Sequence, residues 1–207
     1  MADTSPSETS IANAALTLLG ERRIDSLEDS SKTAKLLKER FSEVRDDVLR
    51  SYPWNFATKR EAIVKDSTAP LWEFKHAYTF PNDLLRLIRI NNPAEHPYRI
   101  EGRMIVTDIT SPIQIEFTAQ IIDAQKMDVL FRQAFAAALA ADIAEAITGS
   151  STKVGEMQAM LREKMRAART PDAQESSPRQ IESSEWLDAR EETGITRNPP
   201  SGVGFPL

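Results

Sequence analysis

The sequence predicts an α+β fold: a four-helix bundle with a β-rich insertion between helices 2 and 3, and an extended C-terminal arm. Three observations support this. Apolar residues recur at helical spacing before residue 56 and after residue 123, strand-like alternation lies between them, and the final stretch is rich in proline. The expected organisation is a helical bundle from residues 1–56 and 123–170, a β-rich lobe at 57–122 and an arm at 171–207.

The first helix is expected over residues 11–19. Its apolar residues share one face, it begins near a Ser or Thr cap, and Gly20 stops it. The loop that follows carries Ile24 and Leu27, which we expect to pack beneath this helix.

The second helix is expected over residues 31–51, and aromatic residues follow its end directly. Ser30 or Ser31 can cap its start, and Pro53 cannot continue a helix. Trp54 and Phe56 follow at once, so Pro53, Trp54 and Phe56 are expected to form a structural hinge between helices and strands, with the aromatic rings buried. The apolar face of this helix consists of Ala34, Leu37, Phe41, Val44 and Val48.

The middle of the chain predicts strands. Gly102 lies where a tight hairpin would turn, between residues 98–100 and 104–106. Residues 113–119 alternate between apolar and polar types, which predicts one buried face and one face in water that includes Gln114, Glu116 and Thr118. The other expected strands are 57–65, 74–80 and 84–90.

Two more helices are expected after the strands. Asp123 is the predicted cap of a helix over 127–148 that ends at Gly149. Its alanine-rich run, with Ala137 and Ala141, permits close approach, so we expect it to be surrounded by its own bundle or by a neighbouring subunit. The last helix, 152–169, has an apolar stripe of Val154, Met157, Leu161 and Met165.

Residues 171–207 differ in kind from the rest. They hold five prolines and few apolar side chains, and cannot form a core of their own. Ile181, Trp186 and Leu187 are the exceptions, and a tryptophan in a polar segment is a candidate anchor. These residues are interface candidates, and they can dock on another molecule or back on their own domain.

Composition excludes several kinds of chemistry. The chain has no cysteine, which removes disulfides and thiolate sites, and its two histidines, His76 and His96, have no metal-binding spacing. We expect no cofactor, no metal and no catalytic residue. A net charge of -5 argues against a dominant nucleic-acid surface, and no apolar run is long enough to cross a membrane. Asp142 and Glu145 suit a polar seam or an ion pair with a neighbour.

Four arginines in the expected β-rich lobe could form a basic patch. Two lie on the strand 84–90 and two on the hairpin, and they suit either phosphate contacts or ordinary salt bridges. They are Arg86, Arg89, Arg99 and Arg103.

Several segments of the chain together carry one family resemblance. The most specific is VRDDVLRSYPWNFA at residues 44–57, and the similarity spans about residues 10–170. The other matching segments are IANAAL at 11–16, LGE at 19–21, IDSL at 24–27, YTFPNDLLR at 78–86 and the helix at 131–147. Together they resemble the phage tail tubular protein A family, the head-to-tail adaptors of short-tailed phages.

The resemblance implies a virion structural protein and not an enzyme. Family members form a ring, typically of twelve copies, below the portal protein, and a distal tail tube or nozzle protein docks beneath them. Double-stranded DNA passes through the ring without sequence-specific binding. The implied partners are therefore further copies of this chain, the portal and the distal tail protein, and the implied location is the virion tail, assembled in the host bacterial cytoplasm.

Two other functions compete with this one. A tail-associated polysaccharide or peptidoglycan hydrolase would need a selected pair of carboxylates, and no signature singles out such a pair. A DNA-binding module would need tight, salt-sensitive binding to duplex DNA.

Overall fold

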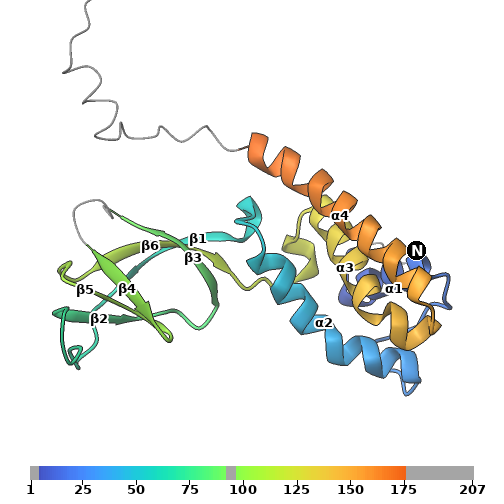
Figure 1. Ribbon diagram of the computed structural model, residues 1–207, viewed down its shortest axis with the longest axis horizontal. Helices are drawn as coiled ribbons and strands as arrows, with labels where there is room; N and C mark the ends of the chain where they lie inside the picture. Colours follow the sequence, from blue (N-terminus) through green and yellow to red (C-terminus); the bar gives the residue numbers. More distant parts are fainter. Residues whose placement is uncertain (1–4, 92–96, 176–207) are drawn as a thin grey trace, which may run out of the picture. The chain divides into compact units, whose positions relative to one another are not determined.

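A computed structural model describes residues 5–91 and 97–175, which belong to one compact unit, Met1–Glu175. This part of the chain has a mixed α+β fold, with four α-helices and two three-stranded antiparallel sheets (Figure 1). The helices are α1 (Glu8–Leu19), α2 (Lys32–Arg50), α3 (Val129–Thr148) and α4 (Ser151–Gln174).

Helix α1 ends where the sequence predicts and begins at Glu8, three residues before the expected start, behind a serine cap. The Ser7 side chain accepts a hydrogen bond from the Ser10 amide, and Gly20 ends the helix with a φ of 78°, a conformation that favours glycine. Asn13 then holds the next loop, because its side-chain amide donates to the Ile24 carbonyl and its oxygen accepts from the Ile24 amide. Ile24 and Leu27 are buried in the helical core, as expected.

The start of α2 is confirmed at Ser31, whose side chain accepts from the Ala34 amide. The expected cap of α3 is wrong. Asp123 instead caps a short 3-10 helix, η2 (Ala124–Lys126), and Asp128 caps α3 by accepting from the amides of Leu130 and Phe131. Two Asp residues five positions apart offer equivalent caps, so local sequence does not choose between them.

Helix α3 is the centre of the helical part and packs against α1, α2 and α4. All residues from 134 to 140 are buried. Ala137 has an exposed fraction of only 1%, which agrees with the first of its two expected surroundings, the bundle of its own subunit. Ala141 is half-buried and packs against the same core.

Helix α4 continues past its expected end at residue 169 and runs through Pro171 to Gln174. Proline removes one backbone donor and opposes helix continuation. A contact from far along the chain compensates for this, because Asp172 in the last turn binds the backbone and side chain of Asn55.

The two sheets share one apolar core. One sheet has the strand order β1-β6-β3 and the other β2-β5-β4. Both contribute to a cluster that includes Ile63, Tyr78, Ile105 and Phe117. The strands are β1 (Thr58–Ile63), β2 (His76–Thr79), β3 (Leu84–Ile90), β4 (Tyr98–Glu101), β5 (Met104–Thr107) and β6 (Ile113–Ala119).

The hairpin between β4 and β5 is confirmed, and Gly102 turns it with a φ of 58°. The expected wet face of β6 is partly wrong. Gln114 is exposed, but Glu116 and Thr118 are buried, because β6 is the central strand and side chains of its two neighbours cover it. Strand order is a tertiary property that alternation within one strand does not report.

Candidate functional site

The junction between α2 and β1, residues 51–57, is packed around Trp54, and we call it the elbow. Trp54 is 1% exposed, and its indole N–H donates to the Val48 carbonyl in the last turn of α2. Its ring stacks edge-to-face on Tyr52 and Phe131, with centroid distances of 5.0 Å and 5.2 Å. Phe56 is half-buried against the same rings, and Pro53 is exposed. The aromatic rings are therefore structural residues of one subunit.

The end of α4 is attached to this elbow through Asp172. Its carboxylate accepts from the Asn55 amide N–H at 3.0 Å, and its carbonyl accepts from the Asn55 side chain. Loss of hydration raises the pKa of Asp172 above 3.8, and the charges of Glu175 and Asp128 raise it further, while the bond from Asn55 opposes the shift. The carboxylate is thus held where its charged form is mildly unfavourable.

Replacing Asp172 with asparagine is expected to leave the melting temperature at pH 7 unchanged or slightly higher. The raised pKa means that the folded state binds more protons than the unfolded state just above pH 3.8, so this group's contribution to stability falls as pH rises through that window. Asparagine keeps an acceptor for the Asn55 amide and removes the charge. Thermal unfolding at pH 4, 5 and 7 measures this.

The alanine variant is the control for that experiment. Asp172→Ala removes the acceptor as well as the charge and should cost about 1 kcal/mol. If the asparagine and alanine variants lose equal stability at pH 7, the hydrogen bond to Asn55 is not what holds the end of α4.

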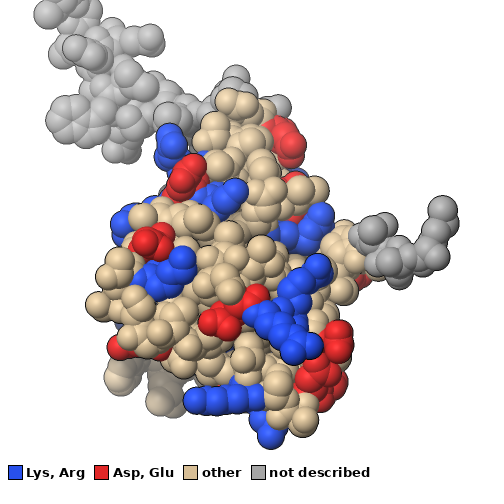
Figure 2. All heavy atoms as spheres, turned by 90° about the vertical axis from the view of Figure 1, so that its right-hand side faces the viewer, with Lys and Arg blue, Asp and Glu red and all other residues tan. Residues whose placement is uncertain are grey.

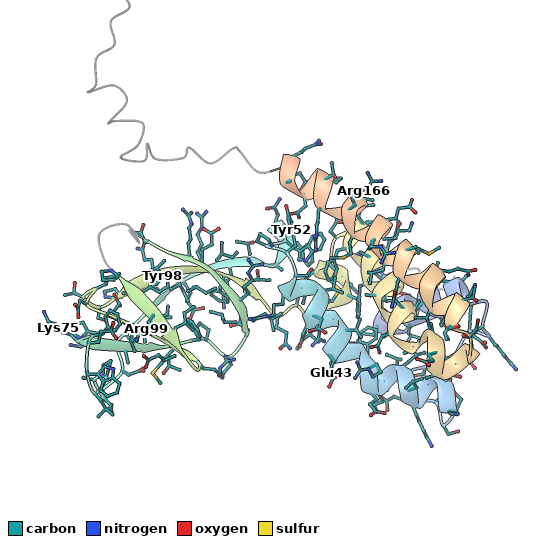
Figure 3. All side chains as sticks on the ribbon, viewed as in Figure 1. Glu43, Tyr52, Lys75, Tyr98, Arg99 and Arg166 are labelled. Carbon is teal, nitrogen blue, oxygen red and sulfur yellow. The ribbon has the colours of Figure 1, made fainter. Side chains whose placement is uncertain are left out.

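A groove runs along the C-terminal half of α4, next to the elbow. Its volume is about 740 Å³. Leu161, Met165 and Tyr52 form its apolar floor and are half-buried against the helical core. Arg162 and Arg166 are exposed along its side. Figure 3 labels Tyr52 and Arg166, which come from the elbow and from α4. The remaining lining residues are Arg169, Thr170, Ala173 and Gln174.

Arg169 has hydrogen-bonding capacity that the described residues do not use. Its guanidinium carbon lies 5.4 Å from the centre of the Tyr52 ring, and one terminal nitrogen donates to the Ser51 hydroxyl at 3.3 Å. Its Nε is buried and has no acceptor in the described part of the chain. A buried donor without an acceptor costs about 1–3 kcal/mol, so an added acceptor here would be stabilising.

The loop between β1 and β2 presents a second surface. Leu71 is 99% exposed and Trp72 is 76% exposed, which is unusual for adjacent side chains of this size. A hollow of about 510 Å³ lies beside them, with Met104, Ala77 and Val106 of the second sheet in its lining. We call residues 66–75 the Trp72 loop.

The Trp72 loop is braced at several points. The Thr79 hydroxyl donates to Asp66 at its start, and the Lys75 amide donates to Asp108 at its end. Between them, the Phe74 amide bonds the Trp72 carbonyl across Glu73, whose φ of 68° is a strained conformation costing about 1–3 kcal/mol.

Arg99 of β4 holds that strained turn through an ion pair with Glu73 at 2.9 Å. Figure 3 labels Arg99, which extends from β4, and Lys75 at the end of the loop. A strained turn fixed by an ion pair, with two exposed apolar side chains, is typical of a binding loop and has no role in the core.

The four arginines expected in a basic patch have other partners. Arg89 pairs with Glu116 at 2.7 Å, and Arg99 pairs with Glu73. Arg86 donates to the Arg50 carbonyl at 3.5 Å, and Arg103 donates to the Pro81 carbonyl at 2.9 Å. The salt-bridge and structural alternative is therefore the one that the geometry favours. Figure 2 shows a different face, that of the helices, on which lysines and arginines are interspersed with carboxylates.

Glu116, a buried carboxylate on the central strand, forms ion pairs with arginines of both neighbouring strands. Glu116 on the central strand pairs with Arg89 of β3 and with Arg60 of β1 at 3.3 Å. All three lie in one row across the sheet, because both arginines are in register with Glu116. The row crosslinks three strands and has the geometry of a structural ion-pair network.

Asp142 also has a structural partner. It accepts two hydrogen bonds from Arg40 of α2, at 2.7 Å and 2.9 Å, which ties α2 to α3 within one subunit. Across residues 5–91 and 97–175, no group of three histidine, aspartate or glutamate side chains is placed to hold a metal ion.

The Trp72 loop and the groove were not predicted from the sequence, and some of the predicted interface residues lie outside the described residues. Ile181, Trp186 and Leu187 lie outside the described residues, as does His96. The sequence marks the Trp72 loop by an apolar pair directly after Pro70 in a polar stretch. It marks the groove by the basic spacing of Arg162, Arg166 and Arg169 on one helix.

Within the described ranges, no helix has both the length and the apolar character needed to cross a membrane. A scan against models of known protein families gave no match. A search of curated proteins gave no match either.

Proposed function

We propose that this protein is a structural head-to-tail adaptor of a short-tailed phage. It acts as a ring, with twelve copies expected, between the portal and a distal tail tube or nozzle protein, around the path of the DNA. In this proposal the helices form a four-helix bundle that faces the portal. The strands between α2 and α3 form a β-rich insertion that faces the distal tail, and residues 171–207 form an extended arm. The resemblance over residues 10–170 supports this assignment.

The observation that carries the proposal is the exposed pair Leu71 and Trp72 on a braced, strained turn. Tryptophan side chains are frequent anchors at protein interfaces, and exposing two large apolar side chains to water is unfavourable unless a partner covers them. The groove on α4 is a second surface on a different element. Two separate docking surfaces on one chain suit a protein that binds more than one neighbour in an assembly.

The charges suit a passage through which DNA moves without being tightly bound. The chain carries a net charge of -5, and the arginines of the β-rich part are engaged with acceptors of their own. Binding to duplex DNA depends on free lysines and arginines that neutralise phosphates. Passing DNA would meet few of them on these strands.

Sizing by native mass spectrometry tests the proposal, with the full chain alone and together with the portal protein of the phage that encodes it. Twelve copies of the 23.2 kDa chain give a ring of about 280 kDa, either free or on the portal. A chain that stays monomeric under both conditions, and is absent from purified virions, would exclude an adaptor role.

Replacing Trp72 with alanine should leave folding unchanged and weaken docking of the distal tail protein at least about tenfold. The side chain is mostly exposed, so the free energy of unfolding should change by no more than about 0.5 kcal/mol. Co-purification with the tail protein and thermal unfolding measure the two effects. Val64→Ala is the matched control, since Val64 is 71% exposed and lies outside the Trp72 loop. Equal docking by both variants would remove this loop from the interface.

A further inference from the structure

We infer that the groove along α4 binds residues 181–192 of a neighbouring copy of this chain. The inference rests on the proposed ring and names the partner of one of its surfaces. The groove is the receiving site, and Trp186 is the anchor that enters it.

The groove has the chemistry to receive an acidic segment with an apolar anchor. Its α4 residues lie in two adjacent rows along the helix, each with a spacing of four residues. One row is Leu161, Met165, Arg169 and Ala173, and the other is Arg162, Arg166, Thr170 and Gln174. Three arginines and no carboxylate lie in this lining. The described residues provide no ion pair for Arg162 or Arg166, and they leave the Nε of Arg169 without an acceptor.

Residues 181–192, IESSEWLDAREE, are complementary to this lining. They contain five carboxylates and one arginine, a net charge of -4, and their apolar residues are Ile181, Trp186, Leu187 and Ala189. A groove of about 740 Å³ is large enough for a tryptophan side chain, and its floor of Tyr52, Leu161 and Met165 is apolar. The carboxylates that flank Trp186 would then meet Arg162, Arg166 and Arg169.

The path of the chain favours a neighbouring copy over the same copy. The groove reaches Gln174, and α4 ends there, so residues 175–180 would have to reverse sharply to return residue 181 to the same groove. A residue before proline favours extended backbone, and Ser177 precedes Pro178. The eleven residues from Glu175 to Trp186 could span at most roughly 36 Å.

Engineered disulfides test this directly, because the chain has no cysteine of its own. Two full-length variants, Thr170→Cys in the groove and Ser184→Cys beside the anchor, are mixed in equal amounts. They are then assembled, alone or with the portal, and oxidised. Peptide mapping by mass spectrometry should find residues 170 and 184 linked between copies in the species larger than a monomer. Ser42→Cys, at an exposed position on α2, replaces the groove variant as the control and should give at least tenfold less linkage.

Charge reversal gives a second measurement. Arg166→Glu, introduced into both cysteine variants, should lower the fraction of linked chains several-fold. Adding Glu185→Arg to both cysteine variants should restore that fraction. Lys153→Glu, on the same helix but outside the groove, makes the same change in net charge and should have little effect.

The possible outcomes distinguish failure of this inference from failure of the adaptor proposal. Rings that form without the link between residues 170 and 184 overturn this inference and leave the adaptor proposal standing. A chain carrying both cysteines that links only within itself also overturns it, because the segment then returns to its own groove. Failure to form any species larger than a monomer, with or without portal, overturns the adaptor proposal and this inference with it.

Discussion

Replacing Trp54 with alanine is expected to lower the free energy of unfolding by about 3–5 kcal/mol. Trp54 is 1% exposed and contacts the rings of Tyr52, Phe56 and Phe131. The substitution leaves a cavity between the helices and the elbow, and it removes the indole donor to the Val48 carbonyl. For a domain of this size the melting temperature should fall by on the order of 10 °C. Circular dichroism during thermal and urea unfolding measures both quantities.

Two variants separate the contributions. Trp54→Phe keeps an aromatic ring and loses the N–H donor, so it should cost roughly 1–3 kcal/mol, less than alanine does. Trp72→Ala makes the same chemical change at a position that is 76% exposed and should cost almost nothing. A Trp54→Ala variant as stable as Trp72→Ala would show that the elbow does not hold the helices together.

Replacing Asn13 with alanine is expected to cost about 2–4 kcal/mol. Its side chain makes two hydrogen bonds to Ile24, 2.9 Å to the carbonyl and 2.8 Å from the amide, and both are buried. Alanine leaves two buried backbone groups without partners and detaches the loop that packs Ile24 and Leu27 against the helical core. Urea unfolding measures the loss, and hydrogen exchange at the Ile24 amide should accelerate with it.

The same substitution at an exposed asparagine is the control for Asn13. Asn91 donates to the Gln114 side chain at 3.1 Å on the surface of the first sheet. Asn91→Ala should change the free energy of unfolding by no more than about 0.5 kcal/mol. If both alanine variants cost the same, burial of the two bonds to Ile24 is not what makes Asn13 important.

Local signals predicted element boundaries well where one residue type is required. Gly20 and Gly102 both adopt a positive φ, which side chains oppose, and the chain turns at each of them. Ser31 caps α2 because its hydroxyl can accept from an amide three residues ahead. These choices depend on a few neighbouring atoms, so sequence alone carries them.

The predicted exposure of a strand face was wrong where side chains from other segments cover that face. Glu116 lies at a position of β6 that alternation assigns to water, yet Arg60 and Arg89 cover it from both adjacent strands. For Ala137 the sequence left two coverings open, its own bundle or a neighbouring subunit, and its exposed fraction within one subunit is 1%. Burial depends on which segments come together across the whole chain, and the periodicity of one segment does not contain that information.

Local sequence patterns predicted that amphipathic helices flank a set of strands and that aromatic residues follow the end of the second helix. The burial of Trp54 was predicted as well, but the exposure of Trp72 emerged only from the folded structure, although both tryptophans follow a proline within two residues. The folded structure also placed the arginines of α4 along a groove beside Tyr52. The physical reason is that exposure and charge pairing arise from contacts between residues distant in the chain, such as Asn55 with Asp172, whereas caps and turns arise from contacts between neighbours.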